Sequence, residues 1–352
     1  MASAANIPVI DLSAKGADEG QVAKELVDAA VEHGFIYIKN TGADIPADVI
    51  ENAFNLSKKL FAAPVEEKQQ CKISNNRGWA GMHVETLDPK NQRIGDYKEA
   101  FNFAAFKDGK AQQPVPETIA PYQSQLASFH NLCQELCLKI NRLLGVGLGV
   151  DPPDFFAAAH IGNDDDRRSD NTLRLLYYPP LKQTDADVED VRAGAHSDYG
   201  SITLLFRKRG QAGLEIHTRE DTWAPVPVSP PGTEDDPAPP ILVNIGDLLS
   251  YWTNGLLRST VHRVVFPGPG KSTVDGETDA EPRYSIAFFC HPVADTALTA
   301  VPSERVKRAA GAAAAADGSN PYAERKVLTA DEHLQMRLRA SYLTLYSDKE
   351  KE

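Results

Sequence analysis

The sequence predicts an α+β fold, in which a mixed helix-and-strand region precedes a β-rich core. Up to about residue 150, stretches with apolar residues at helical spacing alternate with short apolar runs typical of strands. After Asp151, short β-rich runs recur between turn residues, a pattern that indicates an antiparallel sandwich or barrel. We therefore expect a mixed N-terminal region at residues 1–150, a β core at 151–305, and an alanine-rich segment with a C-terminal helix at 306–352.

The first region alternates strands and amphipathic helices. Apolar residues recur three and four positions apart in each expected helix, as one buried face requires, and Gly34 supplies a helix stop. The expected elements are a strand at Ile7–Asp11, a helix at Gln21–His33, a strand at Phe35–Lys39, a helix at Ala47–Phe61 and a long helical stretch at Glu117–Leu148 that Pro121 breaks near its start.

The second region consists of short strands, and a last helix follows it. The expected strands are Leu173–Tyr178, Ile202–Phe206, Leu214–His217, Ile241–Ile245, Val261–Phe266 and Tyr284–Cys290. Proline and glycine mark Glu234–Pro240 and Pro267–Pro282 as loops, and Ala309–Ala316 as a surface segment. Thr329 and Glu332 form a capping box that opens a helix with Leu334, Leu338 and Leu345 on its apolar side.

Composition excludes several classes of function. The chain has 352 residues, of which 37 are basic and 49 acidic, giving a net charge of −12. This balance argues against nucleic acid and against an anionic membrane surface as partners. No apolar run is long enough to span a membrane, and the N-terminal residues do not resemble a signal peptide. Four cysteines are too few for a disulfide framework, so we expect core thiols and a cytoplasmic location.

The segment around His196 and Asp198 carries the clearest chemical signal. If these residues are extended, positions i and i+2 face the same side, so an imidazole and a carboxylate point into one space. His262, in another strand-like run, offers a second imidazole. Two histidines and one carboxylate with open coordination positions form the facial triad of non-haem Fe(II) oxygenases.

A second signal lies downstream at Arg283 and Ser285, which share a face if they lie on a strand. A guanidinium binds a carboxylate through two parallel hydrogen bonds, and a serine hydroxyl adds one more. This pair suits the distal carboxylate of a dicarboxylic co-substrate such as 2-oxoglutarate.

Taken in order along the chain, these motifs resemble the Fe(II)/2-oxoglutarate-dependent dioxygenases of the isopenicillin N synthase-like class. Within that class the likeness is greatest to the fungal thymine dioxygenases. The resemblance rests on segments spread over most of the chain: Ile7–Asp11, His33–Tyr37, Asp88–Phe103, Leu173–Pro180, His196–Asp198, Val243–Asp247, Ser259–Val264 and Arg283–Cys290.

The resemblance implies a double-stranded β-helix (jelly-roll) core with helices packed outside it. It also implies that His196, Asp198 and His262 bind Fe(II), and that Arg283, Ser285 and Tyr178 hold 2-oxoglutarate. The expected reaction consumes O₂ and 2-oxoglutarate, with ascorbate as a candidate stimulant, and hydroxylates a C–H bond of the substrate.

Three further residues are candidates for binding a small, planar or cyclic substrate, for which thymine is one possibility. Phe289 continues the face of Arg283 and offers a ring for stacking. Arg174 offers a hydrogen-bonding fork, and Tyr199 follows the expected metal ligand Asp198 directly. Each of the three is equally compatible with a structural role.

Other functions stay open at this point. The chain fits a fungal natural-product tailoring dioxygenase that hydroxylates, desaturates or rearranges a ring. It also fits an oxidase of the same class that does not use 2-oxoglutarate, and, less well, a jelly-roll module that only binds ligands. The expected partner is a small molecule, and the oligomeric state does not follow from the sequence.

Overall fold

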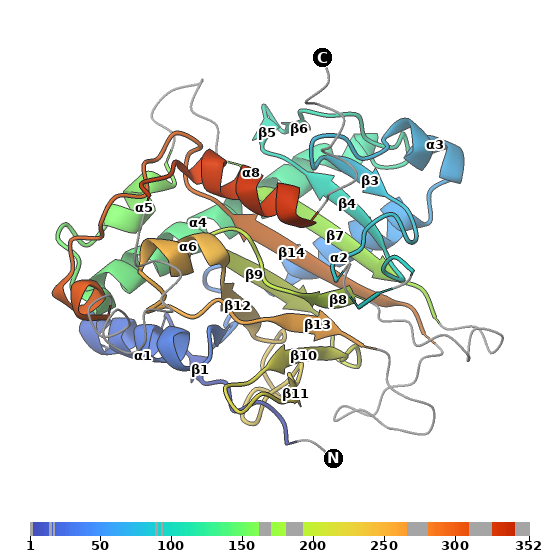
Figure 1. The fold of residues 1–352 in the computed structure, drawn as a ribbon. Helices are drawn as coiled ribbons and strands as arrows, with labels where there is room; N and C mark the ends of the chain where they lie inside the picture. Colours follow the sequence, from blue (N-terminus) through green and yellow to red (C-terminus); the bar gives the residue numbers. More distant parts are fainter. Residues whose placement is uncertain are drawn as a thin grey trace.

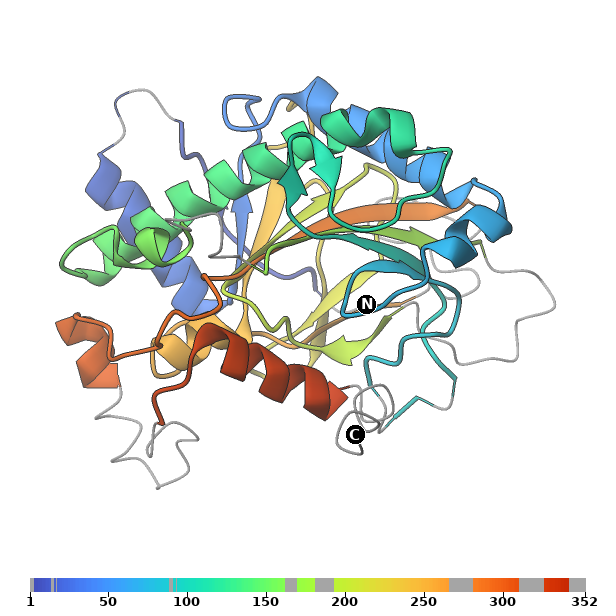
Figure 2. The same ribbon diagram turned by 90° about the horizontal axis from the view of Figure 1, so that it is seen from above.

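The structure is a computed structural model that describes residues 3–13, 16, 18–88, 91–92, 94–161, 170–180, 193–265, 281–309 and 326–341. Two facing β-sheets form its centre, and helices cover the outer side of the larger sheet (Figures 1 and 2). This is the jelly-roll core that the sequence predicts. The Pro267–Pro282 loop and the alanine-rich segment lie outside the described residues, except for Glu281, Pro282 and Ala309, and so does Leu345.

Among the described residues, the larger sheet has eight strands, in the order β1-β2-β12-β9-β14-β7-β4-β3. Its central strands pair antiparallel, whereas β1 and β2 pair in parallel. In chain order the strands are β1 (Val9–Ile10), β2 (Phe35–Ile38), β3 (Gly78–Ala80), β4 (Glu99–Phe103), β7 (Thr172–Tyr178), β9 (Ile202–Arg207), β12 (Ile241–Ile245) and β14 (Arg283–Cys290).

The smaller sheet, as far as the described ranges extend, has four antiparallel strands in the order β11-β10-β13-β8. Its strands are β8 (Ala193–His196), β10 (Leu214–His217), β11 (Trp223–Pro225) and β13 (His262–Val264). A separate hairpin joins β5 (Phe106–Lys107) to β6 (Lys110–Ala111).

Alternation along the central strands separates two apolar clusters. On β14, Ile286 and Phe288 pack toward the helices, whereas Ala287 and Phe289 pack toward the smaller sheet. Successive strand residues point to opposite faces, so every central strand contributes to both clusters. Residues with chemical roles can therefore face the space between the sheets without interrupting the main core.

Helices α1 (Glu19–Glu32), α2 (Ala47–Phe61) and α4 (Gln123–Leu148) lie on the outer side of the larger sheet, as Figure 2 shows. Helix α8 (Ala330–Ser341) lies on the other side, next to the space between the sheets. Shorter helical segments are α3 (Val65–Gln70), the 3-10 turn at Ala120–Tyr122, α5 (Phe155–Ala159) and α6 (Asp247–Trp252).

The long helix expected at Glu117–Leu148 is interrupted near its start, at the proline where the sequence predicts a break. Residues around Pro121 form a 3-10 turn, and the continuous helix runs from Gln123 to Leu148. A proline lacks the N–H that a continuing helix would need. All four cysteines are free and buried, as predicted. Among the described residues, no helix combines the length and apolar character that crossing a membrane requires.

Candidate active site

A cavity lies between the two sheets and contains every residue that the sequence analysis nominates. The larger sheet contributes side chains from β7 and β14, and the smaller sheet contributes β8 and β13. Helix α8 adds Leu334 and Leu338. The nominated residues in its wall are Arg174, Tyr178, His196, Asp198, Tyr199, His262, Arg283, Ser285 and Phe289.

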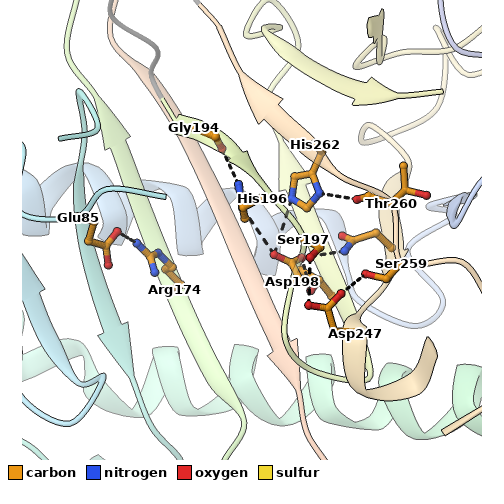
Figure 3. A network of polar contacts seen from close by, with 12 residues as sticks. Glu85, Arg174, Gly194, His196, Ser197, Asp198, Asp247, Ser259, Thr260 and His262 are labelled. Atoms are coloured by element: carbon orange, nitrogen blue, oxygen red, sulfur yellow. Dashed lines mark hydrogen bonds and ion pairs between the residues drawn. The ribbon is translucent and has the colours of Figure 1, made fainter. Parts of the chain in front are cut away.

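Three potential metal ligands converge at one point of this wall. Nε2 of His196 lies 3.8 Å from Oδ1 of Asp198, and Nε2 of His262 lies 3.7 Å from the same oxygen (Figure 3). One donor atom from each residue lies within 4.8 Å of the other two. Among the described residues, this is the one group of histidine, cysteine and acidic side chains with such geometry.

Hydrogen bonds on the far side of each ligand fix which atom faces the shared point. Nδ1 of His196 lies 2.7 Å from the Gly194 carbonyl, and Nδ1 of His262 lies 3.1 Å from that of Thr260. A carbonyl only accepts, so each Nδ1 carries the proton and each Nε2 presents a lone pair.

The electrostatics of the cluster leave it ready to bind a cation. Burial, followed by repulsion from His262, lowers the pKa of His196 to about 4, so this imidazole is neutral at pH 7. Burial raises the pKa of Asp198, but the two imidazoles and hydrogen bonds from Asn244 and Thr203 outweigh burial and lower it. Two imidazole nitrogens and one carboxylate oxygen, with the other coordination positions open, are a donor set that fits Fe(II).

The local structure around Asp198 differs from the extended segment that we expected. Strand β8 ends at His196, and Asp198 lies in the loop that follows. The Asp247 amide donates to the Asp198 carbonyl at 2.7 Å, which holds this loop against α6. A Cβ at Gly246 would lie 2.2 Å from the Gly200 carbonyl, so this approach requires glycine. The loop still brings the carboxylate to the imidazoles.

Asp247 is a residue that the sequence analysis did not select as part of the site. Its carboxylate accepts hydrogen bonds from Ser197 at 3.0 Å and from Ser259 at 2.7 Å, and pairs with Arg337 at 2.7 Å (Figure 3 shows the two serines). Ser197 separates His196 from Asp198, and Ser259 lies three positions before His262. Asp247 therefore connects the segments that carry these three residues to α8. The sequence feature that could have identified Asp247 is its position at the end of Val243–Asp247, one of the segments that resemble the family.

Arg283 and Ser285 lie on the inner face of β14, with Tyr178 opposite Arg283 on β7. Nε of Arg283 donates to the Ala212 carbonyl at 2.8 Å, and its guanidinium lies 4.8 Å from the centre of the Tyr178 ring. These contacts hold the guanidinium in the cavity wall. A buried cation beside a serine hydroxyl fits the carboxylate of a dicarboxylic co-substrate.

Arg174 lies in the wall as predicted, but its guanidinium forms an ion pair with Glu85 (Figure 3). Lys98 contacts Glu85 at 3.2 Å and also pairs with Asp96. Glu85 is separated from Arg174 by 89 positions, so no local pattern could have indicated this pairing. Arg174 belongs to a buried charge cluster, which we name the Glu85 cluster: Glu85, Asp96, Lys98 and Arg174.

Tyr199 and Phe289 lie in the same wall. The guanidinium of Arg337 is 5.6 Å from the centre of the Tyr199 ring. Phe289 packs in the inner apolar cluster, on the side that faces the cavity. His291 is buried and lines the cavity as well.

Comparison with known proteins connects this geometry to a family. Residues 7–122 match the family model described as the N-terminal domain of non-haem dioxygenases in morphine synthesis. Residues 169–292 match the model of the 2OG-Fe(II) oxygenase superfamily, and this stretch contains all nine nominated residues.

Individual relatives agree with these matches. The 2-oxoglutarate-dependent dioxygenase htyE of Aspergillus rugulosus is 30% identical over 81% of this chain and 86% of its own length. UPF0676 protein C1494.01 of Schizosaccharomyces pombe is 39% identical over 85% of this chain and 86% of its own length. The structure of the Neurospora crassa thymine dioxygenase with alpha-KG and thymine aligns with a TM-score of 0.75 at 29% identity, covering 97% of this chain and 100% of that one.

The similarity to htyE extends over most of both chains, and the fold and the converging ligands agree with it. The chain therefore belongs to the 2OG-Fe(II) oxygenase superfamily and is an oxidoreductase that uses Fe(II) and 2-oxoglutarate.

Proposed function

We propose that this dioxygenase hydroxylates a C–H bond of a small, planar or cyclic substrate in the cavity between the sheets. In this proposal His196, Asp198 and His262 hold Fe(II), and Arg283, Ser285 and Tyr178 hold 2-oxoglutarate. The observation that carries the proposal is that one cavity contains both the converging ligands and the buried Arg283.

The protein's own groups orient the reactants and exclude other chemistry. Thr203 and Asn244 each donate to Oδ2 of Asp198 at 2.7 Å, which turns Oδ1 toward the two imidazoles. Arg283 fixes one end of the co-substrate, so its other end is directed toward the metal ligands. When bound, iron and 2-oxoglutarate together convert O₂ into an oxidant for C–H bonds, releasing succinate and CO₂.

Thymine is the first substrate to test. The Neurospora crassa structure in complex with thymine has the same fold, and Phe289 offers a ring on which a flat substrate can stack. The second candidate is a larger ring compound of natural-product metabolism. The apolar side chains of Leu334 and Leu338 in the cavity wall favour it, as does the pairing of Arg174 with Glu85.

The test is succinate formation by protein loaded with Fe(II) without oxygen, then given 2-oxoglutarate and O₂. Thymine, uracil and a panel of small aromatic natural products are added one at a time. Succinate that rises with thymine, together with a hydroxymethyl product, supports the pyrimidine substrate. Slow succinate formation that no pyrimidine stimulates supports the second candidate.

Asp198→Ala is the control, because it removes one of the three proposed metal ligands. We expect succinate formation to fall to background in this variant. Turnover retained by Asp198→Ala would contradict the metal assignment, and wild-type protein that forms no succinate with any compound tested would contradict the proposed hydroxylation of such a ring.

A further inference from the structure

The cavity has a polar wall on β4 and β7, at a distance along the sheet from Arg283. Asn102 on β4 is in register with Arg174 on β7, so the two are neighbours on the inner face. Phe101 and Phe103 pack toward the helices, and Asn102 between them points the other way, into the cavity wall. Lys98 lines the same cavity.

The charges of this wall balance one another. Arg174 and Lys98 both contact Glu85, and Lys98 also pairs with Asp96, so two cations face two carboxylates. Burial raises the pKa of Glu85, but Arg174 and Lys98 outweigh it and lower the pKa to about 2, so Glu85 is ionised at pH 7. The Glu85 cluster therefore offers no net positive charge to an anionic substrate.

Asn102 has a fixed amide orientation. Its Nδ2 lies 3.1 Å from the carbonyl of Asn76 and 2.9 Å from Oδ1 of Asn76. The Asn76 carbonyl only accepts, so the Asn102 amide nitrogen must face it and Oδ1 must face away. Within the described part of the chain, this Oδ1 accepts no hydrogen bond, although the side chain is only 1% exposed.

A buried acceptor without a partner costs free energy, and a ligand that donates to it recovers that cost. The hydrogen bonds to Asn76 use only Nδ2 of Asn102, so a purely structural role for this side chain does not account for its Oδ1. Phe289 lies on the same inner face and favours a flat ring, whose N–H groups lie in the ring plane.

We propose that Asn102 is a specificity-determining residue, and that its Oδ1 accepts a hydrogen bond from a ring N–H of an uncharged, planar substrate. Lactams, imides and pyrimidines belong to this class. The inference rests on the proposed function, because it assumes that the substrate occupies this cavity beside bound 2-oxoglutarate.

The first experiment varies the ligand and leaves the protein unchanged. Wild-type protein with Fe(II) and saturating 2-oxoglutarate, kept without oxygen, is titrated calorimetrically with matched pairs of rings. The pairs are thymine with its 1-methyl, 3-methyl and 1,3-dimethyl forms, oxindole with N-methyloxindole, and quinolin-2-one with its N-methyl form. We expect the N–H member of a bound pair to have a Kd lower by about tenfold or more.

The second experiment varies the protein. Asn102→Leu keeps a similar volume but removes the acceptor, so N–H and N-methyl forms should bind within about twofold of each other. Leu87→Ala is the matched control, since it opens the same cavity without removing a polar atom, and it should retain the discrimination. Affinity for 2-oxoglutarate, measured on each variant, reports whether the site is intact.

Two results would overturn the inference. One is an Asn102→Leu variant that binds 2-oxoglutarate normally and still discriminates against N-methyl forms as the wild type does. The other is wild-type protein that binds none of the N–H rings, or binds them no more tightly than their methylated partners. Succinate formation and 2-oxoglutarate binding test the proposed function, whereas the comparison of N–H and N-methyl rings tests the role of Asn102. The two proposals can therefore fail independently.

Discussion

At the scale of single residues, Glu85 is the carboxylate that both Arg174 and Lys98 contact, and it is 5% exposed. Removing one partner of a buried ion pair leaves the others charged and uncompensated. The sequence indicated His196, Asp198 and Arg283 because each belongs to a short local pattern. It could not indicate the partners of Arg174, because tertiary structure alone brings Glu85 to it.

Glu85→Gln should lower the free energy of unfolding by about 3–5 kcal/mol at neutral pH, since Arg174 and Lys98 lose their shared carboxylate. The pKa of Glu85 is about 2 in the folded protein and ordinarily 4.5, so its contribution is complete above pH 4.5 and is lost as pH falls toward 2. The difference between wild type and variant should therefore shrink in acid. Urea unfolding at about pH 7 and about pH 3 measures it.

Glu51→Gln is the comparison for this change, because Glu51 pairs with Lys208 and its side chain is 55% exposed. The Glu51→Gln change should lower the free energy of unfolding by less than about 1 kcal/mol. Equal costs for the two variants at neutral pH would show that the Glu85 cluster does not contribute in this way.

Arg283→Gln should weaken 2-oxoglutarate binding by about tenfold to a hundredfold, because a charge-assisted hydrogen-bonding pair is lost. Calorimetry on Fe(II)-loaded protein without oxygen gives this Kd directly and needs no substrate. Arg142→Gln, at a surface ion pair with Glu19 on the outer helices, should leave the Kd unchanged. An unchanged Kd in Arg283→Gln would remove Arg283 from the co-substrate site.

At the scale of elements, short strands were the hardest to predict. Most of the expected strands and helices are present, because apolar spacing defines them locally. Strand β8 was missed, since Ala-Gly-Ala-His has little of the β-branched and aromatic character that marks strands. Strand β4 was noted only as part of the family-like segment Asp88–Phe103, although it carries Asn102. Pairing with the neighbouring strand β13, rather than propensity, creates β8.

Helix α8 lines the cavity, and one ion pair links it to Asp247 at the start of α6. Arg337 pairs with Asp247 at 2.7 Å, and their side chains are 35% and 16% exposed. Arg337→Ala should therefore speed amide hydrogen exchange in α8 by about threefold to tenfold, a modest effect because solvent screens the pair. Mass spectrometry of exchanged peptides measures it.

Arg339→Ala is the matched control for α8, because Arg339 lies on the same helix but is exposed. Exchange in α8 should be unchanged in this variant. If both arginine variants exchange at the same rate, the Arg337–Asp247 pair does not hold the helix.

At the scale of the whole molecule, strands from distant parts of the chain share one sheet. Strand β2, near the N-terminus, pairs with β12, and β4 pairs with β7. The division of the chain at residue 150 stays a prediction, but hydrogen bonding across that position joins the two regions in one sheet. Local sequence patterns do not encode such pairing, so the order of strands in the sheet could not be predicted from them.

Stability should reside on the helix side of the larger sheet. Phe288→Ala should cost about 3–5 kcal/mol, because this fully buried ring packs among the helices, 5.0 Å from the His130 ring. Phe289→Ala should cost only about 1–2 kcal/mol, since its ring already borders a cavity. Urea unfolding of the two variants tests this, and equal losses would contradict the separation of the two clusters.

The alternation along β14 also has a consequence for laboratory evolution of this protein. Positions 283, 285, 287 and 289 face the cavity, whereas Ile286 and Phe288 face the helices. A mutagenesis library restricted to positions 287 and 289 would therefore change the cavity wall with little loss of folded protein, and it would keep the proposed 2-oxoglutarate contacts of Arg283 and Ser285. A single inserted residue would exchange the two sets, so this strand can be redesigned by substitution but not by changing its length.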